Sequence, residues 1–485
     1  MTTNQLDQKL DQWLETNKTW MVEELKQWVS HPSVSRADLA EEGAPYGPDC
    51  RKMLDFALLR AEELGFRVRD NSGYCGDIFL DGQLAGEEGA NPEPNEIGFV
   101  CHLDVVPEGD HWIYEPYKPV EKDGFLIGRG VGDNKGSAVL VLSAMKFLKE
   151  TQISLKKTIR LMLGCAEETG MADYRHYLNE LNGTVPAVSI VADAGFPVCY
   201  GQKGGYNAAL LIPAGSDIVD FSAGSVRNII PDTAVLTIKG VTVKEAEEAL
   251  AGQIGIEVEA AGSCVAITAR GKSGHAAFPE GGDNAIRRLA EAVRSSELIQ
   301  KLDLAGISFL ADAFISPYGS GLGIDFEDQE SGKLTLNAGV IKKEDGHLKV
   351  DIDIRYPVTV KAEQITAILD QVLAENQVQI TEKDISNPYY INPSDPKVTA
   401  LMQIYKEITG DDAKPYTMGG GTYSRVVPNA ISYGPGLRYR NVRPDFLPEG
   451  HGNAHGPDET LNIESWLIGF RIYIHSILKL DQLEL

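Results

Sequence analysis

The chain has 485 residues, 43% of them hydrophobic, which is enough for a large core and for two or more domains. Its formal net charge of −25 would repel nucleic acids and anionic membranes, so we exclude both as partners. No run reaches the ~18 apolar residues of a membrane-spanning helix, and the polar N-terminus lacks a signal-peptide pattern. The six cysteines are scattered, and Cys101 and Cys165 lie in apolar segments, which predicts buried thiols in a reducing cytoplasm.

Residues 1–204 and 385–485 alternate helical and strand patterns. This alternation predicts an α/β domain with a mixed sheet flanked by helices. Helices are predicted over 20–29, 49–64, 138–148, 397–409 and 461–480, and strands over 66–69, 76–80, 96–101, 158–165 and 187–192. A loop rich in Gly, Pro and Glu is predicted over 85–96.

The pattern changes after Lys203, and residues 205–384 are predicted to form an inserted α+β domain. Its strands are predicted over 207–212, 234–238, 256–259, 264–269, 334–341, 348–355 and 377–381, and its helices over 244–251, 284–294 and 361–375. The order of elements partly returns in the second half of this insert. The similarity between the halves is too weak to define a repeat.

Acidic residues and histidines follow the predicted strands of the first domain. His102 and Asp104 follow the strand over 96–101, Glu167 and Glu168 follow the strand over 158–165, and Asp193 follows the strand over 187–192. An open α/β sheet presents its site at the carboxyl ends of its strands. We therefore expect these side chains to gather at one edge of the sheet.

Two further candidates lie in loops. Asp133 lies in a loop of small residues before the helix over 138–148, and His455 lies near the C-terminus. Each candidate taken alone is most simply a helix cap or a surface charge. Together with the strand ends they provide two imidazoles and three carboxylates, from His102, Asp133, Glu168, Asp193 and His455.

Five such ligands exceed the three protein ligands of a single catalytic zinc. They suit two divalent cations if one carboxylate bridges, because each cation then receives three protein ligands. Three carboxylates and one bound hydroxide would also balance the four positive charges. A hydroxide between two cations stays deprotonated near neutral pH, since metals lower the pKa of water towards ~7. The mixed ligation favours Zn²⁺, and Mn²⁺ or Co²⁺ can occupy such sites.

The adjacent residues Glu167 and Glu168 cannot readily both face the same pair of cations. We assign Glu168 as the ligand and Glu167 as the general base, which takes a proton from the bridging water and gives it to the leaving amine. Asp104, two residues from His102, is placed to orient that imidazole.

These segments, in this order, resemble the M20 family of metallopeptidases, and within it the PepV-type dipeptidases, which also act on carnosine-like dipeptides. The resemblance spans nearly the whole chain. It rests on the following segments: His102 with Asp104, residues 128–130 leading to 133–136, Glu167 with Glu168, Asp193, and His455 with Asp458 and Glu459. It implies one zinc on His102 and Asp193, another on Glu168 and His455, and Asp133 as the bridge. It also implies a peptide bond after Asp133 that is often cis.

The inserted domain resembles the lid of this family. By that resemblance, His275 in the segment 271–280 would stabilise the developing oxyanion, and Asn228 would lie near the substrate. Arg355 would bind the substrate carboxylate through two hydrogen bonds. The backbone of Gly421 and Thr422 would approach the ligand closely. The alternatives are a loop histidine without a role and, for the arginine, a structural ion pair.

The resulting hypothesis is a cytoplasmic, monomeric dizinc dipeptidase that hydrolyses dipeptides with a free N-terminus. The enlarged lid favours a monomer, because it can reach its own site. His451 and His475 are interpreted as a loop residue and a helix residue, not as ligands. An N-acyl amino acid or succinyl-diamine deacylase on the same scaffold is one alternative. A non-catalytic metal-containing binding protein is another, although binding alone has no need of a base such as Glu167.

Overall fold

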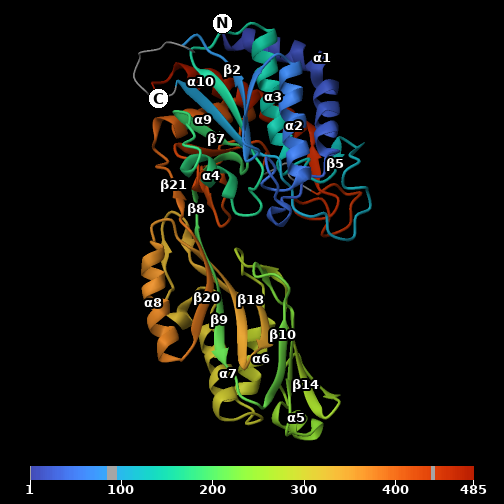
Figure 1. The fold of residues 1–485 in the computed structure, drawn as a ribbon, viewed down its shortest axis with the longest axis vertical. Coiled ribbons are helices and arrows are strands. Elements are labelled where there is room, and N and C mark those ends of the chain that lie inside the picture. Colours follow the sequence, from blue (N-terminus) through green and yellow to red (C-terminus); the bar gives the residue numbers. More distant parts are fainter. Residues whose placement is uncertain (1, 85–94, 438–442, 485) are drawn as a thin grey trace. The chain divides into compact units, whose positions relative to one another are not determined.

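The computed structural model describes residues 2–84, 95–437 and 443–484. Most of the loop predicted over 85–96 therefore lies outside the described residues. The chain divides into two compact units (Figure 1). The first unit comprises residues 1–200, 391–416 and 422–485, and the second comprises 201–390 and 417–421. None of the described helices is both long enough and apolar enough to span a membrane.

The first unit is built on a mixed sheet with the strand order β1-β2-β6-β3-β7-β23-β8, and the short strands β21 and β22 each pair with β8. The bounds are β1 Arg67–Asn71, β2 Cys75–Leu80, β3 Glu96–His102, β6 Thr158–Gly164, β7 Val188–Val191, β8 Gly195–Gln202, β21 Tyr389–Tyr390, β22 Tyr416–Met418 and β23 Ala430–Gly434. The neighbours β6, β3, β7 and β23 are parallel. Parallel strands are covered on both faces, which explains why β3 and β6 are almost wholly apolar.

Helices flank this sheet. Their bounds are α1 Thr3–Val29, α2 Pro48–Glu63, α3 Lys135–Glu150, α4 Ala172–Asn179, α9 Pro396–Thr409 and α10 Ile463–Gln482. A small sheet of β4 Val120–Lys122, β5 Phe125–Ile127 and β24 Thr460–Asn462 lies in the same unit. Helix α3 packs between α1 and α10, and its side chains from 135 to 145 are all buried. The core therefore extends from these helices onto β3 and β6.

Helix α1 begins at Thr3, so the prediction that this helix starts at residue 20 was wrong. A capping box between Thr2 and Gln5 starts it. Leu6, Leu10 and Trp13 are buried along one stripe of the helix. The many polar residues on the other faces hid this helical period in the sequence.

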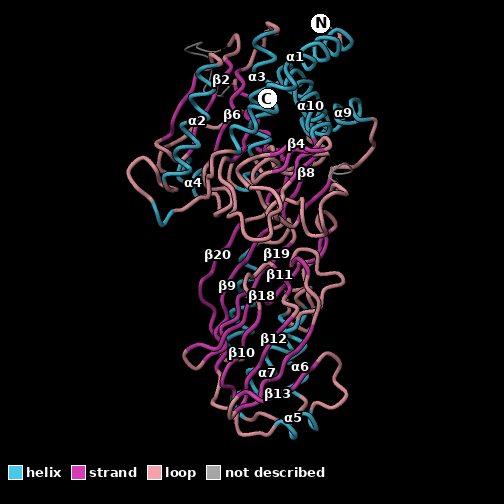
Figure 2. The backbone as a smooth tube through the Cα atoms, turned by 90° about the vertical axis from the view of Figure 1, so that its right-hand side faces the viewer, coloured by secondary structure: helices cyan, strands magenta, loops and turns pink. Residues whose placement is uncertain are grey.

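The second unit contains an antiparallel sheet with the order β13-β14-β12-β10-β18-β19-β9-β20 (Figure 2). The bounds are β9 Gly204–Pro213, β10 Ile218–Ala223, β12 Thr233–Ile238, β13 Ile256–Ala261, β14 Cys264–Arg270, β18 Thr335–Glu344, β19 His347–Tyr356 and β20 Gln379–Ser386. Two short strand pairs add β11 Ile229–Ile230 with β15 Gly274–His275, and β16 Glu327–Asp328 with β17 Gly332–Lys333. The two predicted halves of the insert thus share one sheet: β10 pairs with β18, and β9 of the first half lies between β19 and β20 of the second.

The helices of the second unit are α5 Val243–Ala249, α6 Ala285–Arg294, α7 Lys301–Ala313 and α8 Ala362–Glu375. Helix α6 contacts β12 and β14, and α7 contacts β9. Helix α7 was not predicted. The predicted fold class is confirmed: a mixed α/β sheet flanked by helices, with a separate α+β unit inserted in the chain.

Candidate metal centre

Three parallel neighbours, β6, β3 and β7, deliver candidate ligands at one edge of the sheet. His102 is the last residue of β3 and lies in register with Gly164, the last residue of β6. Glu168 therefore follows close to the end of β6, and Asp193 follows β7 on the other side of β3. This shared edge is the position that the sequence predicted for the site.

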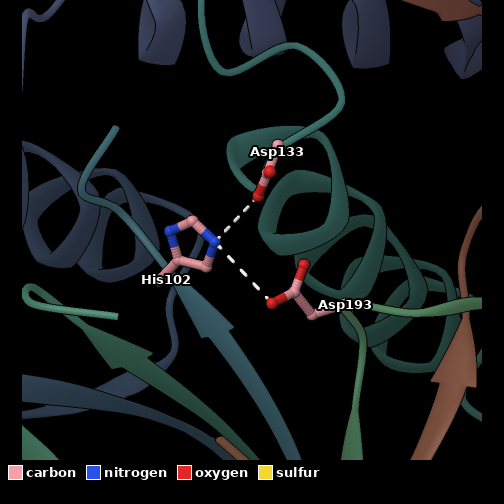
Figure 3. Close-up of side chains that lie close together, drawn as sticks. All are labelled: His102, Asp133 and Asp193. Carbon is pink, nitrogen blue, oxygen red and sulfur yellow. Dashed lines mark hydrogen bonds and ion pairs between the residues drawn. The ribbon is translucent and has the colours of Figure 1, made fainter. Parts of the chain in front are cut away.

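Asp133 lies between two imidazoles. Its Oδ1 is 2.9 Å from Nε2 of His102, and its Oδ2 is 3.1 Å from Nε2 of His455. Asp133 and Asp193 both lie beside the ring of His102 (Figure 3), and His102 Nε2 is 3.9 Å from Asp193 Oδ2. His455 Nε2 is 3.0 Å from Glu168 Oε1. The five residues thus form two groups that share one carboxylate, and within each group the ligand atoms lie within 4.8 Å of one another.

Asp104 orients both His102 and the two glutamates. Nδ1 of His102 donates to the backbone carbonyl of Asp104 at 2.9 Å, whereas the Asp104 carboxylate is 3.5 Å away. This bond leaves Nε2 facing Asp133 and Asp193. The carboxylate of Asp104 accepts the backbone N–H groups of Glu167 at 3.1 Å and Glu168 at 3.0 Å.

The loop that carries Asp133 is held by Glu459. The buried carboxylate of Glu459 accepts the backbone N–H groups of Gly130, Gly132 and Asp133 and pairs with Arg129 at 2.8 Å. Glu459 belongs to one of the motifs of the sequence, but no role for it was predicted. The run of small residues before Asp133 was the available sequence signal for such an acceptor, because small side chains leave the backbone N–H groups accessible.

Asn134 is a second supporting residue that the sequence analysis gave no role. Its side-chain oxygen accepts the N–H of His102 at 3.3 Å, and its Nδ2 donates to the carbonyl of Ala192 at 2.8 Å and to Asp193 Oδ1 at 3.0 Å. It therefore ties the end of β3 to the end of β7. The peptide bond between Asp133 and Asn134 is cis, as the resemblance implied.

The charges of this cluster fit divalent cations. Burial, and next the charge of Asp133, raises the pKa of Asp193 to about 8. Burial acts in the same direction on Asp133, but hydrogen bonds from His102 and His455 lower its pKa below the ordinary value. Burial therefore disfavours the charge of this carboxylate, and a cation bound beside it would favour that charge. Two imidazoles and three carboxylates are also the ligand types that zinc accepts.

Glu167 is 9% exposed and lies beside this cluster without belonging to either group of ligand atoms. Burial, and next the charge of Asp193, raises the pKa of Glu167 well above its ordinary value. A carboxyl group that exchanges a proton near neutral pH needs a raised pKa. Bound cations would act in the opposite direction.

Two candidates of the second unit, Asn228 and His275, lie close together. β11 pairs with β15, so Ile229 lies opposite His275, and the N–H of Ala276 donates to the carbonyl of Asn228 at 2.9 Å. Nδ1 of His275 accepts the N–H of Ala277 at 3.1 Å. Both His275 and Asn228 are exposed.

Arg355, near the end of β19, forms an ion pair with Asp353 at 3.1 Å and donates to the carbonyl of Gly419 at 3.3 Å. The structural ion pair considered from the sequence is therefore present. The half-buried Gly421 ends the segment 417–421. Thr422 is buried, and its hydroxyl accepts the N–H of Ser424.

Two histidines that the sequence analysis did not assign as ligands lie outside both groups of ligand atoms. His451 contacts the buried carboxylate of Asp458 at 2.6 Å, which also accepts the N–H groups of Ile113 and Tyr114. His475, in α10, contacts Asp7 at 3.0 Å. Both histidines thus have partners of their own.

Comparison with known proteins relates the chain to peptidases. A Bacillus subtilis protein named "Putative dipeptidase YtjP" is 28% identical over 477 residues, covering 95% of this chain and 97% of that protein. A Staphylococcus epidermidis protein named "Putative dipeptidase" is 30% identical over 432 residues, covering 85% and 89%. The solved structure of the dipeptidase Dug1p from Saccharomyces cerevisiae shares the fold with a TM-score of 0.57 at 13% identity, covering 99% of both chains.

The family model described as peptidase family M20/M25/M40 matches residues 98–479. This range covers most of the chain and includes all five candidate ligands. The resemblance drawn from the sequence is therefore confirmed, and the chain belongs to the M20/M25/M40 family of peptidases, a family of hydrolases.

Proposed function

We propose that the protein is a dipeptidase that uses two divalent cations to hydrolyse dipeptides with a free N-terminus. The observation that carries this proposal is the pair of ligand groups that share Asp133. One carboxylate oxygen of Asp133 faces His102, and the other faces His455. Membership of the peptidase family and the dipeptidase names of the relatives support it.

His102 and Asp193 would hold one cation, and Glu168 and His455 the other, with Asp133 between them. We propose Zn²⁺ for both positions, and Mn²⁺ or Co²⁺ would suit the same ligands. When bound, such cations polarise a carbonyl group and lower the pKa of water towards ~7. Asp104, Asn134 and Glu459 would hold three of these ligands in place before any cation arrives.

Glu167 would act as the general base. Its buried carboxylate would take a proton from the attacking water and return that proton to the leaving amine nitrogen. Asp104 supports this role because it accepts the N–H of Glu167 and so fixes the backbone from which the carboxylate extends. The products are two free amino acids, one of which carries the new carboxylate.

The second unit would supply the contacts to the substrate. We propose that Arg355 binds the substrate α-carboxylate and that His275 donates a hydrogen bond to the developing oxyanion. Asn228 and Gly421 of this unit, and Thr422 of the first unit, would line the bound peptide. We further propose a monomer that acts in the cytoplasm. Light scattering of the purified protein tests the oligomeric state, and fractionation of cells tests the compartment.

A substrate panel tests this function. Protein purified without added metal is analysed for bound cations and then assayed on free-amine dipeptides, on N-acyl amino acids and on N-succinyl diamines. We expect two cations per chain and turnover of dipeptides. Turnover restricted to the acylated substrates would show a deacylase, and bound cations without any turnover would show a binding protein.

A further inference from the structure

The segment 165–168, which we name the glutamate turn, connects the end of β6 to the Glu167–Glu168 pair. Its four consecutive backbone N–H groups all donate to buried carboxylates. Asp104 accepts those of Glu167 and Glu168, as described above. Oδ2 of Asp173 accepts those of Cys165 at 2.6 Å and Ala166 at 2.9 Å.

Asp173 lies in the first turn of α4, and its side chain has no exposed surface. The same Oδ2 also accepts the hydroxyl of Tyr423 at 2.5 Å, and Oδ1 accepts the N–H of Tyr174 at 2.7 Å. Space at this point is restricted. A Cβ on Gly164 would lie 1.9 Å from the Tyr423 hydroxyl and 2.6 Å from Asp173 Oδ2, so glycine is required there.

These contacts join two parts of the site that are far apart in sequence. Tyr423 directly follows Thr422 and stacks edge-on against Tyr174, with ring centroids 4.7 Å apart. Its ring also meets that of His102 edge-on, at 6.5 Å. Asp173 is therefore bonded to the backbone that precedes the glutamates and to a ring that packs near a candidate ligand.

We propose that Asp173 is a positioning residue that, together with Asp104, sets the direction in which Glu167 and Glu168 leave the end of β6. This inference deepens the proposed function and rests on it for the roles of the two glutamates. Hydrogen bonds from backbone N–H groups to a carboxylate are charge-assisted and short, so they restrict a turn more than neutral bonds do. Without Asp173, two buried N–H groups at the base of the turn would lose their acceptor.

The consequence should appear at the site and not in stability alone. Groups that orient metal ligands typically contribute 10- to 100-fold to metal affinity or activity. We therefore expect Asp173→Ala to weaken zinc binding and to lower kcat by about 10- to 100-fold, with a smaller change in KM. Asp173→Asn keeps an oxygen acceptor and should recover part of both losses.

The chain offers a matched control in Asp481. This buried residue of α10 also accepts two consecutive backbone N–H groups on one oxygen, from Lys156 at 2.9 Å and Lys157 at 2.8 Å. It belongs to the same unit, and among the described residues it forms no hydrogen bond with a candidate ligand. Asp481→Ala should lower the melting temperature and leave zinc affinity and kcat unchanged.

The experiment measures melting temperature, zinc affinity of the metal-free full-length chain by titration calorimetry, and kcat and KM on a dipeptide. Loss of zinc affinity and kcat in Asp173→Ala but not in Asp481→Ala supports the proposal. Equal behaviour of the two variants in zinc affinity and kcat overturns it. If the alanine variant does not fold, Asp173→Asn is compared with Asp481→Asn by the same criterion, and Tyr423→Phe removes a single donor to Asp173.

The zinc titration separates this inference from the proposed function. If the unaltered chain hydrolyses no dipeptide, the proposed function fails. The positioning role is then still decided by whether Asp173→Ala binds zinc more weakly than Asp481→Ala.

Discussion

In the first unit, the candidate ligands are fixed from behind by buried polar groups, whereas the exposed candidates of the second unit are fixed mainly by backbone pairing. Asp104, Asn134 and Glu459 are each at most 1% exposed, and all three bond to the ligands or to the loops that carry them. His275 and Asn228 are exposed and lie on the short pairing of β11 with β15.

This difference separates two tasks. A metal site gains affinity when its ligands are held in place before binding, because little conformational entropy is then lost. Contacts to a variable peptide gain from adaptable side chains on a defined backbone. A buried side chain of the second unit also holds the backbone near a candidate residue. Nδ2 of Asn337 donates to the carbonyls of Arg227 and Ile229, on either side of Asn228.

The largest expected effect is that of the base. Glu167→Ala should lower kcat by about 10²- to 10⁴-fold, the usual scale of general acid–base catalysis, while bound zinc stays at the level of the unaltered chain. Steady-state kinetics with metal analysis of the same sample measures both. Glu180→Ala, an exposed residue at the end of α4, is the control. Undiminished turnover in Glu167→Ala would show that Glu167 is not the general base.

The next effect tests how firmly the first unit is held. Glu459→Ala removes the acceptor of three N–H groups in the loop of Asp133 and leaves the buried Arg129 without its carboxylate partner. We expect zinc affinity to fall by about 10- to 100-fold, measured by titration of the metal-free chain. A variant that binds zinc as tightly as the unaltered chain would show that the loop needs no such support.

In the second unit, Arg355→Lys should raise KM for dipeptides by about 10-fold, or ~1.4 kcal/mol, because lysine cannot bind a carboxylate through a planar fork. The effect should disappear for a dipeptide amide, which lacks the carboxylate. Arg270→Lys in the same unit, where the arginine pairs with Glu257 at the surface, controls for the substitution. An equal change of KM for both substrates would assign Arg355 only to its ion pair with Asp353.

The smallest effect concerns the hydrogen bonds from Asn337 to the backbone on either side of Asn228. Asn337→Ala frees the carbonyls of Arg227 and Ile229, and we expect kcat/KM to fall by about fivefold, equivalent to one hydrogen bond of ~1 kcal/mol. Asn376→Ala, at the end of α8, is the control. A loss of kcat/KM of about 10- to 100-fold, the size of the loss in zinc affinity expected for Glu459→Ala, would contradict the contrast drawn between the two units.

Much of the candidate site could be predicted because its residues stand at fixed points of the sequence. His102 ends a strand, and Asp193 comes two residues after another, so the topology of parallel strands is enough to bring them together. The contacts of Glu459 and Asp173 could not be predicted. Each depends on a backbone path that brings distant N–H groups to one carboxylate. No sequence pattern around either residue predicts these contacts.

The fold was predictable where the apolar pattern is strong, as in β3 and α3. It was missed in the first half of α1, where polar residues dominate, in α4 and α7, and in the strands β8, β10 and β23. Gly306 weakens the helical signal in α7. The structure explains this glycine by close approach, since a Cβ there would lie 3.0 Å from the carbonyl oxygen of Pro213. Gly306 is thus explained by a tertiary contact with β9, which the sequence pattern does not predict.

The most direct test of the central claim is anomalous diffraction from a crystal of the zinc-loaded protein. Two peaks per chain are expected, one among His102, Asp133 and Asp193 and the other among Asp133, Glu168 and His455, with one oxygen of Asp133 towards each. Zinc found elsewhere on the chain, or a single peak that leaves one of these two groups without metal, would contradict the account.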